Sequence, residues 1–371
     1  LKIKNYVKAE SLAQAYELNQ KKNAIVLGGM VWLKMGNRNI MTAIDLSGLG
    51  LDTITETEEA FVIGCMTPLH ALETHKELNA YTNSAIRESV RHIVGVQFRN
   101  CATVGGSIFG RFGFSDVLTM FLALDTWVEL YNGGTIPLAQ FASMEKDNDI
   151  LVNIIVKKQP LNSVYLSQRN NSTDFPVLTC AAALIDGKAR TVIGARPGKA
   201  MIVEDEEEIL KDFVQMNAQQ KKDAAASFAA YAAEHVPTDK NMRASKEYRS
   251  LLVKVLQEEP GKRSEGEQNE YHFRLNGVKR QAEVRPDELL LDFLRKNSCY
   301  SVKRGCETAN CGLCTVLMDE RPVLSCSMLA ARADGKRIVT LEGMQEEAKE
   351  FGAFMANEGA EQCVLMGVQS V

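Results

Sequence analysis

The 371-residue sequence predicts an α+β multidomain protein, and three observations support this class. A chain of this length is expected to form two or three domains. Short apolar runs of strand type alternate with segments of helical periodicity up to about residue 236. A polar, glycine-containing and charged stretch at 260–269 is typical of an exposed linker between folded parts.

Composition narrows the class of protein. The chain is 45% hydrophobic and 24% charged, which is ordinary for a globular protein, and its net charge of −4 provides no basic face for nucleic acid. No apolar run reaches the length of a membrane span, and the N-terminus lacks a secretory apolar region. Nine cysteines, mostly in apolar sequence, favour a reducing compartment. We therefore expect a cytoplasmic protein without nucleic-acid or membrane partners.

Residues 1 to about 57 are expected to form a small α/β unit. The predicted elements are a helix capped by Ser11 and strands at 24–27 and 42–46. The first of these strands ends at Gly28-Gly29. Backbone N–H groups at such a pair can approach a phosphate closely, although a plain turn is the commoner reason for two glycines after a strand.

Residues 58 to about 160 are expected to form a second α/β unit. Its predicted elements are a strand at 60–64, helices at 67 onward, 84–93 and 117–124, a strand-like run at 97–107 and a hairpin turn at 132–134. The run at 97–107 ends in a second pair, Gly105-Gly106. Neither pair matches a Rossmann or P-loop motif, but together they could clamp one diphosphate. Asp116 could accept hydrogen bonds from a sugar hydroxyl, or it could simply cap the following helix.

Residues 161–236 predict an α+β unit with antiparallel strands. The expected elements are strands at 163–167, 176–185 and 189–193 with a turn at Asp186-Gly187, and helices at 204–216 and 219–234. A further helix at 245–258 and the linker follow.

From residue 270 the pattern predicts a β-grasp fold of ferredoxin type. A hairpin at 271–284 turns at Asn276-Gly277, a helix begins near Pro286, and strands are expected at 315–318 and 337–341. The five histidines show no metal-binding spacing, and no catalytic residue is predicted.

Four cysteines of this part have the spacing of a plant-type [2Fe–2S] loop, C-x4-C-x2-C followed by a fourth cysteine. The candidate ligands are Cys306, Cys311, Cys314 and Cys326. Small residues among them, Gly305, Ala309 and Gly312, allow the backbone to fold tightly so that N–H groups point at the sulfurs. A four-cysteine zinc site and a disulfide framework are the alternatives.

Several motifs resemble one known family. They are the stretch 98–107, Ser115-Asp116, the stretch 290–295, Gly305-Cys306-Glu307, the stretch 311–314, Leu324-Ser325-Cys326 and the stretch 340–343. With them, nearly the whole chain resembles the molybdenum hydroxylases, the xanthine dehydrogenase family. Residues 1–236 resemble the FAD-binding medium subunit, and residues 270–345 resemble the ferredoxin-like half of the iron–sulfur small subunit.

The resemblance implies a domain order. An FAD-binding domain of PCMH type, with subdomains 1–57 and 58–160, precedes a flavoprotein C-terminal domain at 161–236. A helix and linker at 237–269, a plant-type [2Fe–2S] domain at 270–345 and a truncated helical tail at 346–371 follow.

The resemblance also implies FAD, bound by residues of both glycine loops and a few others. These are Ala24, Ile25, Val26, Leu27, Gly28, Gly29, Met30, Val31, Ile93, Thr103, Val104, Gly105, Gly106, Ser107, Asp116 and Leu151. Met30 stands where the family usually has a small polar residue, and Leu166 stands where it often has a basic one.

The family's small subunit continues into a helical domain with a second [2Fe–2S] cluster. Here that motif begins at 359–363, and only Cys363 of its four ligands is present. We therefore expect one [2Fe–2S] cluster and no second cluster.

The function implied is electron transfer within a xanthine dehydrogenase-like oxidoreductase. Electrons would pass from a molybdopterin-containing large subunit through the cluster to FAD, and on to an acceptor such as NAD, in a hetero-oligomer. One alternative is a self-contained NAD(P)H-dependent flavin/iron–sulfur reductase, which would oxidise NADH with a dye. Another is a non-redox assembly or scaffold chain, which would hold zinc and no iron.

Overall fold

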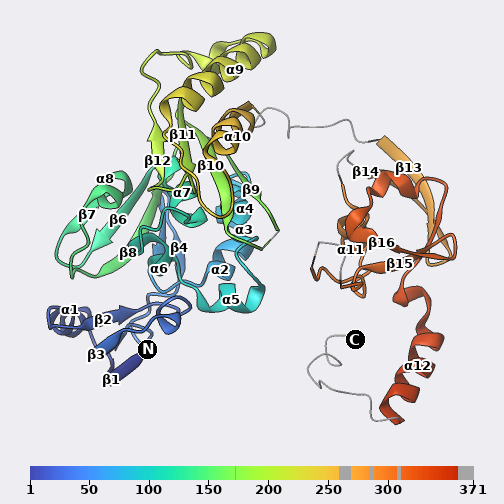
Figure 1. Cartoon of the computed structure of the whole chain (residues 1–371), viewed down its shortest axis with the longest axis horizontal. Helices are drawn as coiled ribbons and strands as arrows, with labels where there is room; N and C mark the ends of the chain where they lie inside the picture. The colour runs from blue at the N-terminus through green and yellow to red at the C-terminus, as the bar shows by residue number, and fades with distance from the viewer. Residues whose placement is uncertain (172, 259–268, 285–287, 307–310, 358–371) are drawn as a thin grey trace. The chain divides into compact units, whose positions relative to one another are not determined.

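The computed structural model describes the chain except for residues 172, 259–268, 285–287, 307–310 and 358–371. It divides into two compact units, Leu1–Gly261 and Lys262–Val371 (Figure 1). Each unit combines helices with a sheet or sheets, which confirms the predicted α+β multidomain class. The expected linker at 260–269 falls almost wholly outside the described residues. Among the described helices, none combines the length and the apolar character needed to cross a membrane.

The N-terminal unit begins with a parallel sheet of order β1-β3-β2. Its strands are β1 (Lys2–Lys8), β2 (Ala24–Leu27) and β3 (Asn39–Asp45). Helix α1 (Leu12–Asn19) connects the first two strands, and the Ser11 side chain accepts a hydrogen bond from the Gln14 N–H, so the predicted cap is confirmed. Strand β1 was not expected, because most of its side chains are polar and exposed.

A second, antiparallel sheet has the order β4-β5-β8-β6-β7. Its strands are β4 (Ile54–Glu56), β5 (Ala60–Gly64), β6 (Thr126–Leu130), β7 (Gly134–Pro137) and β8 (Leu151–Lys157). The helices in this segment are α2 (Leu69–Thr74), α3 (Lys76–Tyr81), α4 (Ala85–Val90), α5 (Val96–Cys101), α6 (Val104–Phe109), α7 (Asp116–Ala123) and α8 (Leu138–Ser143). The hairpin turn predicted at 132–134 joins β6 to β7.

The strand-like run predicted at 97–107 is wrong. The chain forms helices α5 and α6 there, separated by two extended residues, Ala102 and Thr103. The Thr103 side chain accepts a hydrogen bond from the Gly106 N–H and so caps α6. The cap and the tertiary packing override the strand propensity of Thr103 and Val104.

A third sheet, of order β12-β11-β10-β9, is antiparallel and has helices on both faces (Figure 1). Its strands are β9 (Leu161–Arg169), β10 (Pro176–Ile185), β11 (Lys188–Gly194) and β12 (Met201–Val203). Alternate residues enter different cores: Ala181 joins the core around α7, and Cys180 joins the core with α9 (Ala218–His235) and α10 (Lys246–Glu258). Every residue of α7 is buried.

The helix predicted at 204–216 is also wrong. Only a short 3-10 turn, η2 (Phe213–Gln215), forms there. Glu208 and Asp212 have positive φ angles of 54° and 55°, which interrupt a helix. The Asp205 carboxylate accepts hydrogen bonds from nearby backbone N–H groups instead.

The C-terminal unit contains a five-stranded mixed sheet of order β14-β13-β17-β15-β16, as expected for a β-grasp fold. Its strands are β13 (Asn269–Leu275), β14 (Val278–Val284), β15 (Thr315–Met318), β16 (Arg321–Leu324) and β17 (Arg337–Val339). Helix α11 (Leu290–Lys296) buries four apolar side chains against this sheet. Helix α12 (Gln345–Asn357) follows, and Cys363 lies outside the described residues.

Candidate functional site

The two predicted glycine loops lie against each other in the structure. A Cβ on Gly29 would come within 1.9 Å of the Cys101 carbonyl oxygen, and one on Gly28 within 2.9 Å of Thr103 Oγ1. No side chain fits at the first of these positions, so Gly29 is required for the close approach. Loops that are more than seventy residues apart in the chain therefore form one local structure.

The two loops differ in what their N–H groups can do. In the second loop, Val104 N–H donates to Thr67 O (2.9 Å) and Gly105 N–H to Cys65 O (2.8 Å), and Gly106 N–H donates to Thr103 Oγ1 (3.1 Å). In the first loop, the N–H groups of residues 28–32 donate no hydrogen bond to any described residue. The first loop thus presents free donors, and the second supports it.

Asp116 lies in a buried polar cluster. It is the first residue of α7, whose cap is Ser115, so the capping role considered for Asp116 does not hold. Its carboxylate accepts a hydrogen bond from the Tyr165 hydroxyl at 2.6 Å and pairs with the Arg169 guanidinium. Burial raises the pKa of Asp116, and the Arg169 charge and the Tyr165 hydroxyl oppose that rise.

Two further residues expected near FAD, Ile93 and Leu151, lie in different environments. Ile93 is half-buried, and its carbonyl oxygen accepts a hydrogen bond from Arg99 Nη1 at 3.1 Å. Arg99 is itself held by Glu73, with Nε 2.8 Å from the carboxylate. Leu151 is buried in β8 as part of the core.

An aromatic cluster lies next to the first loop and was not predicted. The Trp32 ring centre is 5.7 Å from that of Phe114 and 5.4 Å from that of Phe175, and Phe112 stacks on Phe114. Phe114 and Phe175 line a cavity of about 330 Å³ together with Arg243. Trp32 comes three residues after the glycine pair, and this proximity in the sequence is the one signal that could have indicated the aromatic cluster. Arg169 and Tyr165 gave no such signal.

Cys306 and Cys311 form one pair of sulfur atoms in the C-terminal unit. Cys306 N–H donates to Cys311 Sγ at 3.4 Å, and Cys311 N–H donates to Cys306 Sγ at 3.3 Å. A Cβ on Gly305 would lie 2.7 Å from Cys311 Sγ, so glycine is needed for this sulfur to sit where it does. Gly312 has φ +72°, which also favours glycine. Ala309 lies outside the described residues.

Cys314 and Cys326 form the second pair and are buried. Burial raises the pKa of Cys314; the Cys326 N–H lowers it, while the Cys326 thiol raises it. Ser325 fixes the two segments relative to each other, because its N–H and hydroxyl both donate to the Cys314 carbonyl oxygen, at 3.2 and 2.7 Å.

This arrangement fits a [2Fe–2S] cluster. Such a cluster takes four thiolates, two on each iron, and the structure holds two pairs of sulfur atoms. Among the residues described, which omit 307–310, no three His, Cys, Asp or Glu side chains gather at a single point suited to one metal ion.

Comparisons with known families match one segment in each of the two units. Residues 1–158 match the FAD binding domain in molybdopterin dehydrogenase, and residues 273–340 match the 2Fe-2S iron-sulfur cluster binding domain. The chain joins the FAD-binding domain of molybdopterin dehydrogenases to one [2Fe–2S] domain. The predicted resemblance to the molybdenum hydroxylases is thereby confirmed.

We call this protein the flavin/iron–sulfur chain. Each of the following relatives matches only a segment of it. It is 44% identical over 79 residues, 21% of this chain and 50% of that protein, to the nicotinate dehydrogenase small FeS subunit of Eubacterium barkeri. It is 42% identical over 91 residues, 24% of this chain and 57% of that protein, to the xanthine dehydrogenase iron-sulfur-binding subunit of Escherichia coli O157:H7. The chain thus spans about half the length of these relatives.

The N-terminal part of the flavin/iron–sulfur chain has relatives of similar length. It is 26% identical over 263 residues, 68% of this chain and 93% of that protein, to the uncharacterized protein YgfM of Escherichia coli K12. A chain of the reconstituted CO dehydrogenase from Oligotropha carboxidovorans superposes with a TM-score of 0.62 at 22% identity, over 71% of this chain and 98% of that one. At this identity the likeness shows the fold alone.

Proposed function

We propose that this chain is the electron-transfer component of a molybdenum hydroxylase, an oxidoreductase of the xanthine dehydrogenase type. The observation that carries the proposal is the presence, in one chain, of a glycine loop with free N–H donors and a loop with two pairs of cysteine sulfurs. When bound, FAD and [2Fe–2S] supply two-electron and one-electron chemistry, and the protein positions them.

The first loop is the proposed cradle of the FAD diphosphate. The N–H groups of residues 28–32 are free to donate to phosphate oxygens, and Met30, with φ +57°, turns the backbone there. The second loop, Thr103–Ser107, and the two residues before it would hold the first in place through the contacts of Gly28 and Gly29. The strand residues 24–27, with Val31, Ile93 and Leu151, would surround the cofactor.

The aromatic cavity beside Trp32 is the proposed place of the flavin ring. Phe114 and Phe175 provide flat apolar faces of the kind on which a planar ring packs. The Asp116 carboxylate already accepts a hydrogen bond from the Tyr165 hydroxyl. To bind the ribityl chain of FAD, it would have to accept a second hydrogen bond, from a ribityl hydroxyl. The cluster would be held by Cys306 and Cys311 on one iron and by Cys314 and Cys326 on the other.

The finer parts of the proposal concern partners. A molybdopterin-containing large subunit would oxidise a purine or another heterocycle and supply the electrons. NAD or another acceptor would take these electrons from FAD. The cytoplasm is the proposed location, since the cysteine ligands have to stay reduced before they bind iron. No residue of this chain is proposed to carry out acid–base catalysis.

A reductive titration tests electron transfer directly. The anaerobic chain is titrated with dithionite while the visible spectrum is followed, and we expect about three electrons per chain, one for the cluster and two for FAD. Uptake of about one or about two electrons would contradict the proposal of two centres. In a second arm, NADH replaces dithionite: bleaching supports a nicotinamide as acceptor, and its absence excludes NAD.

A further inference from the structure

The aromatic cavity has a polar part in an otherwise apolar wall. Its volume is about 330 Å³, and proline and alanine side chains lie beside the rings of Phe114 and Phe175. The polar side chains that line it, Asn241 and Arg243, both come from one short segment between α9 and α10. A flavin ring has the same division, with an apolar dimethylbenzene end and a polar end that carries carbonyl oxygens and ring nitrogens. The polar end of a flavin in this cavity would therefore face residues 241–243.

A fully buried arginine holds this segment in place. The Arg249 guanidinium, from α10, donates to the Val177 carbonyl oxygen in β10 at 2.9 Å and to two carbonyl oxygens of the segment 239–244, at 2.7 and 2.8 Å. Its Nη2 also donates to Asn241 Oδ1 at 2.6 Å, and the Arg243 N–H donates to the same oxygen at 2.9 Å. Arginine is rarely buried so completely, and here its hydrogen bonds tie the segment to β10 and fix the backbone that carries Arg243.

Arg243 lies over one of the two rings of the cavity. Its guanidinium carbon is 4.8 Å from the centre of the Phe175 ring, and its Nη2 pairs with Asp174 Oδ1 at 3.2 Å. Its Nη1 donates to no described residue and, unlike its Nε, is not buried. A cationic side chain that lines the cavity thus keeps one accessible donor without a partner among the described residues.

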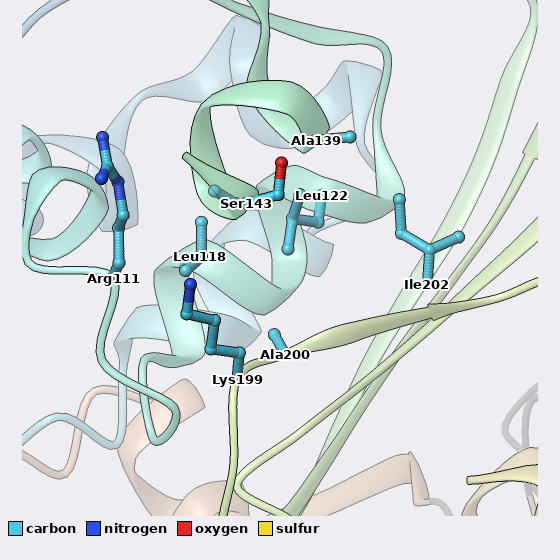
Figure 2. Close-up of a pocket in the computed structure, with 9 residues that line it drawn as sticks. Arg111, Leu118, Leu122, Ala139, Ser143, Lys199, Ala200 and Ile202 are labelled. Atoms are coloured by element: carbon cyan, nitrogen blue, oxygen red, sulfur yellow. The ribbon is translucent and has the colours of Figure 1, made fainter. Parts of the chain in front are cut away.

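An arginine in the wall of another cavity differs in this respect. That cavity, of about 190 Å³, lies beside α7 and has Arg111 in its wall (Figure 2). Nη1 of Arg111 donates to the Met144 carbonyl oxygen at 2.9 Å, and its Nε and Nη2 are buried and so closed to a ligand. Of these two arginines, Arg243 is the one whose accessible nitrogen lacks a partner among the described residues.

We propose that Arg243 stabilises the negative charge that FAD gains on reduction, and so raises the reduction potential of the flavin. The inference rests on the proposed function, because it takes the flavin ring to occupy the aromatic cavity. When the ring takes up two electrons from the cluster, one at a time, and one proton from solvent at N5, one negative charge remains on N1 and the C2 carbonyl oxygen. A guanidinium close to these atoms favours the reduced form by Coulomb attraction.

A potentiometric titration of the full chain, loaded with FAD and the cluster, tests this role. Reference dyes report the potential in the absence of oxygen, and the visible spectrum reports the state of each centre. We expect Arg243→Gln to favour oxidised FAD about tenfold, which lowers the potential of this two-electron couple by about 30 mV. The potential of the cluster, whose proposed ligands belong to the C-terminal unit, stays as in the parent.

Three further variants separate charge from structure. Asp174→Asn removes the carboxylate that offsets the charge of Arg243, so it raises the FAD potential, which a loss of structure would not do. Arg243→Lys keeps the charge and retains most of the parent's FAD potential. Arg87→Gln, at an exposed arginine of α4, leaves both potentials unchanged.

Three results of the titration would overturn the inference. They are an unchanged FAD potential in Arg243→Gln, a lowered FAD potential in Asp174→Asn, and equal shifts of FAD and cluster in either variant. Loss of FAD from Arg243→Gln but not from the parent would overturn it as well, because the arginine would then serve binding. A parent chain that binds no FAD would overturn the proposed function itself.

Discussion

Gly29 is the residue on which the contact between the two glycine loops depends. A Cβ there would overlap the Cys101 carbonyl oxygen, which belongs to the backbone and cannot rotate away. We predict that Gly29→Ala displaces the first loop and weakens FAD binding about tenfold or more, as overpacking of about 1–3 kcal/mol implies. Flavin content after dialysis, with a titration of free FAD, measures the effect.

Gly36→Ala is the matched control for that variant. A Cβ on Gly36 would meet only the Leu33 carbonyl oxygen, at the ordinary distance of 3.5 Å. Flavin content of this variant is expected to equal that of the parent. Equal flavin content in Gly29→Ala would remove the first loop from the FAD site.

The buried pair of Asp116 and Arg169 gives a second prediction at this scale. Both side chains are 6% exposed, so removing one leaves the other charge buried without its partner. Arg169→Met is expected to lower the free energy of unfolding of the N-terminal unit by about 3–5 kcal/mol. Urea unfolding measures it. Adding Asp116→Asn should recover part of the loss, and a double variant no better than the single one would show that the charge is not the cause.

At the residue scale, the sequence predicted some residues of the proposed FAD site but not others. The glycine pairs were visible because a strand ending in two glycines is a local pattern. The sequence did not show which loop has free N–H groups. Only the fold shows that the N–H groups of Val104 and Gly105, in the second loop, already donate to backbone carbonyl oxygens. Arg169 was missed because its partner Asp116 is 53 residues away in the chain.

At the scale of elements, the turn from β17 toward α12 stabilises the C-terminal unit in a pH-dependent way. Burial alone would raise the pKa of Glu342, but hydrogen bonds from Ser301 and Thr340 more than offset this, and the pKa is lowered. A carboxylate with a lowered pKa stabilises the fold above its usual pKa of about 4.3 and loses that contribution as the pH falls through the folded value.

The resulting prediction concerns Glu342→Gln. At pH 7 the variant is expected to lose about 1 kcal/mol of stability in the C-terminal unit, after allowance for solvent screening. The difference from the parent should shrink below a pH of about 4. Thermal unfolding across pH measures it. Glu346→Gln, at a side chain that is 88% exposed, should change nothing; a difference for Glu342→Gln that is independent of pH would contradict the account.

Elements marked by a clear turn signal were predicted, and two segments whose side chains bond to the nearby backbone were not. The hairpin at Asn276-Gly277 formed as expected because both residues accept positive φ, here 50° and 84°. The run at 97–107 became two helices because Thr103 caps one of them. The acidic run before residue 209 did not form a helix, since the Asp205 carboxylate accepts hydrogen bonds from the N–H groups of residues 209 and 210 instead.

At the scale of the whole molecule, two compact units imply two separately loaded centres. Cys326 belongs to the C-terminal unit, and the glycine loops belong to the N-terminal unit. We predict that Cys326→Ser loses most of its iron and keeps its FAD, because no residue proposed for FAD lies in the C-terminal unit. Iron and flavin assays on the same sample measure both. Loss of FAD together with iron would show that the two units do not load independently.

Metal and flavin content of the parent chain, purified without oxygen, tests the central claim most directly. The account predicts about two irons and one FAD per chain, with the visible absorption of both centres. Zinc in the cysteine loop with no iron would contradict it, and about four irons would contradict the expectation of a single cluster.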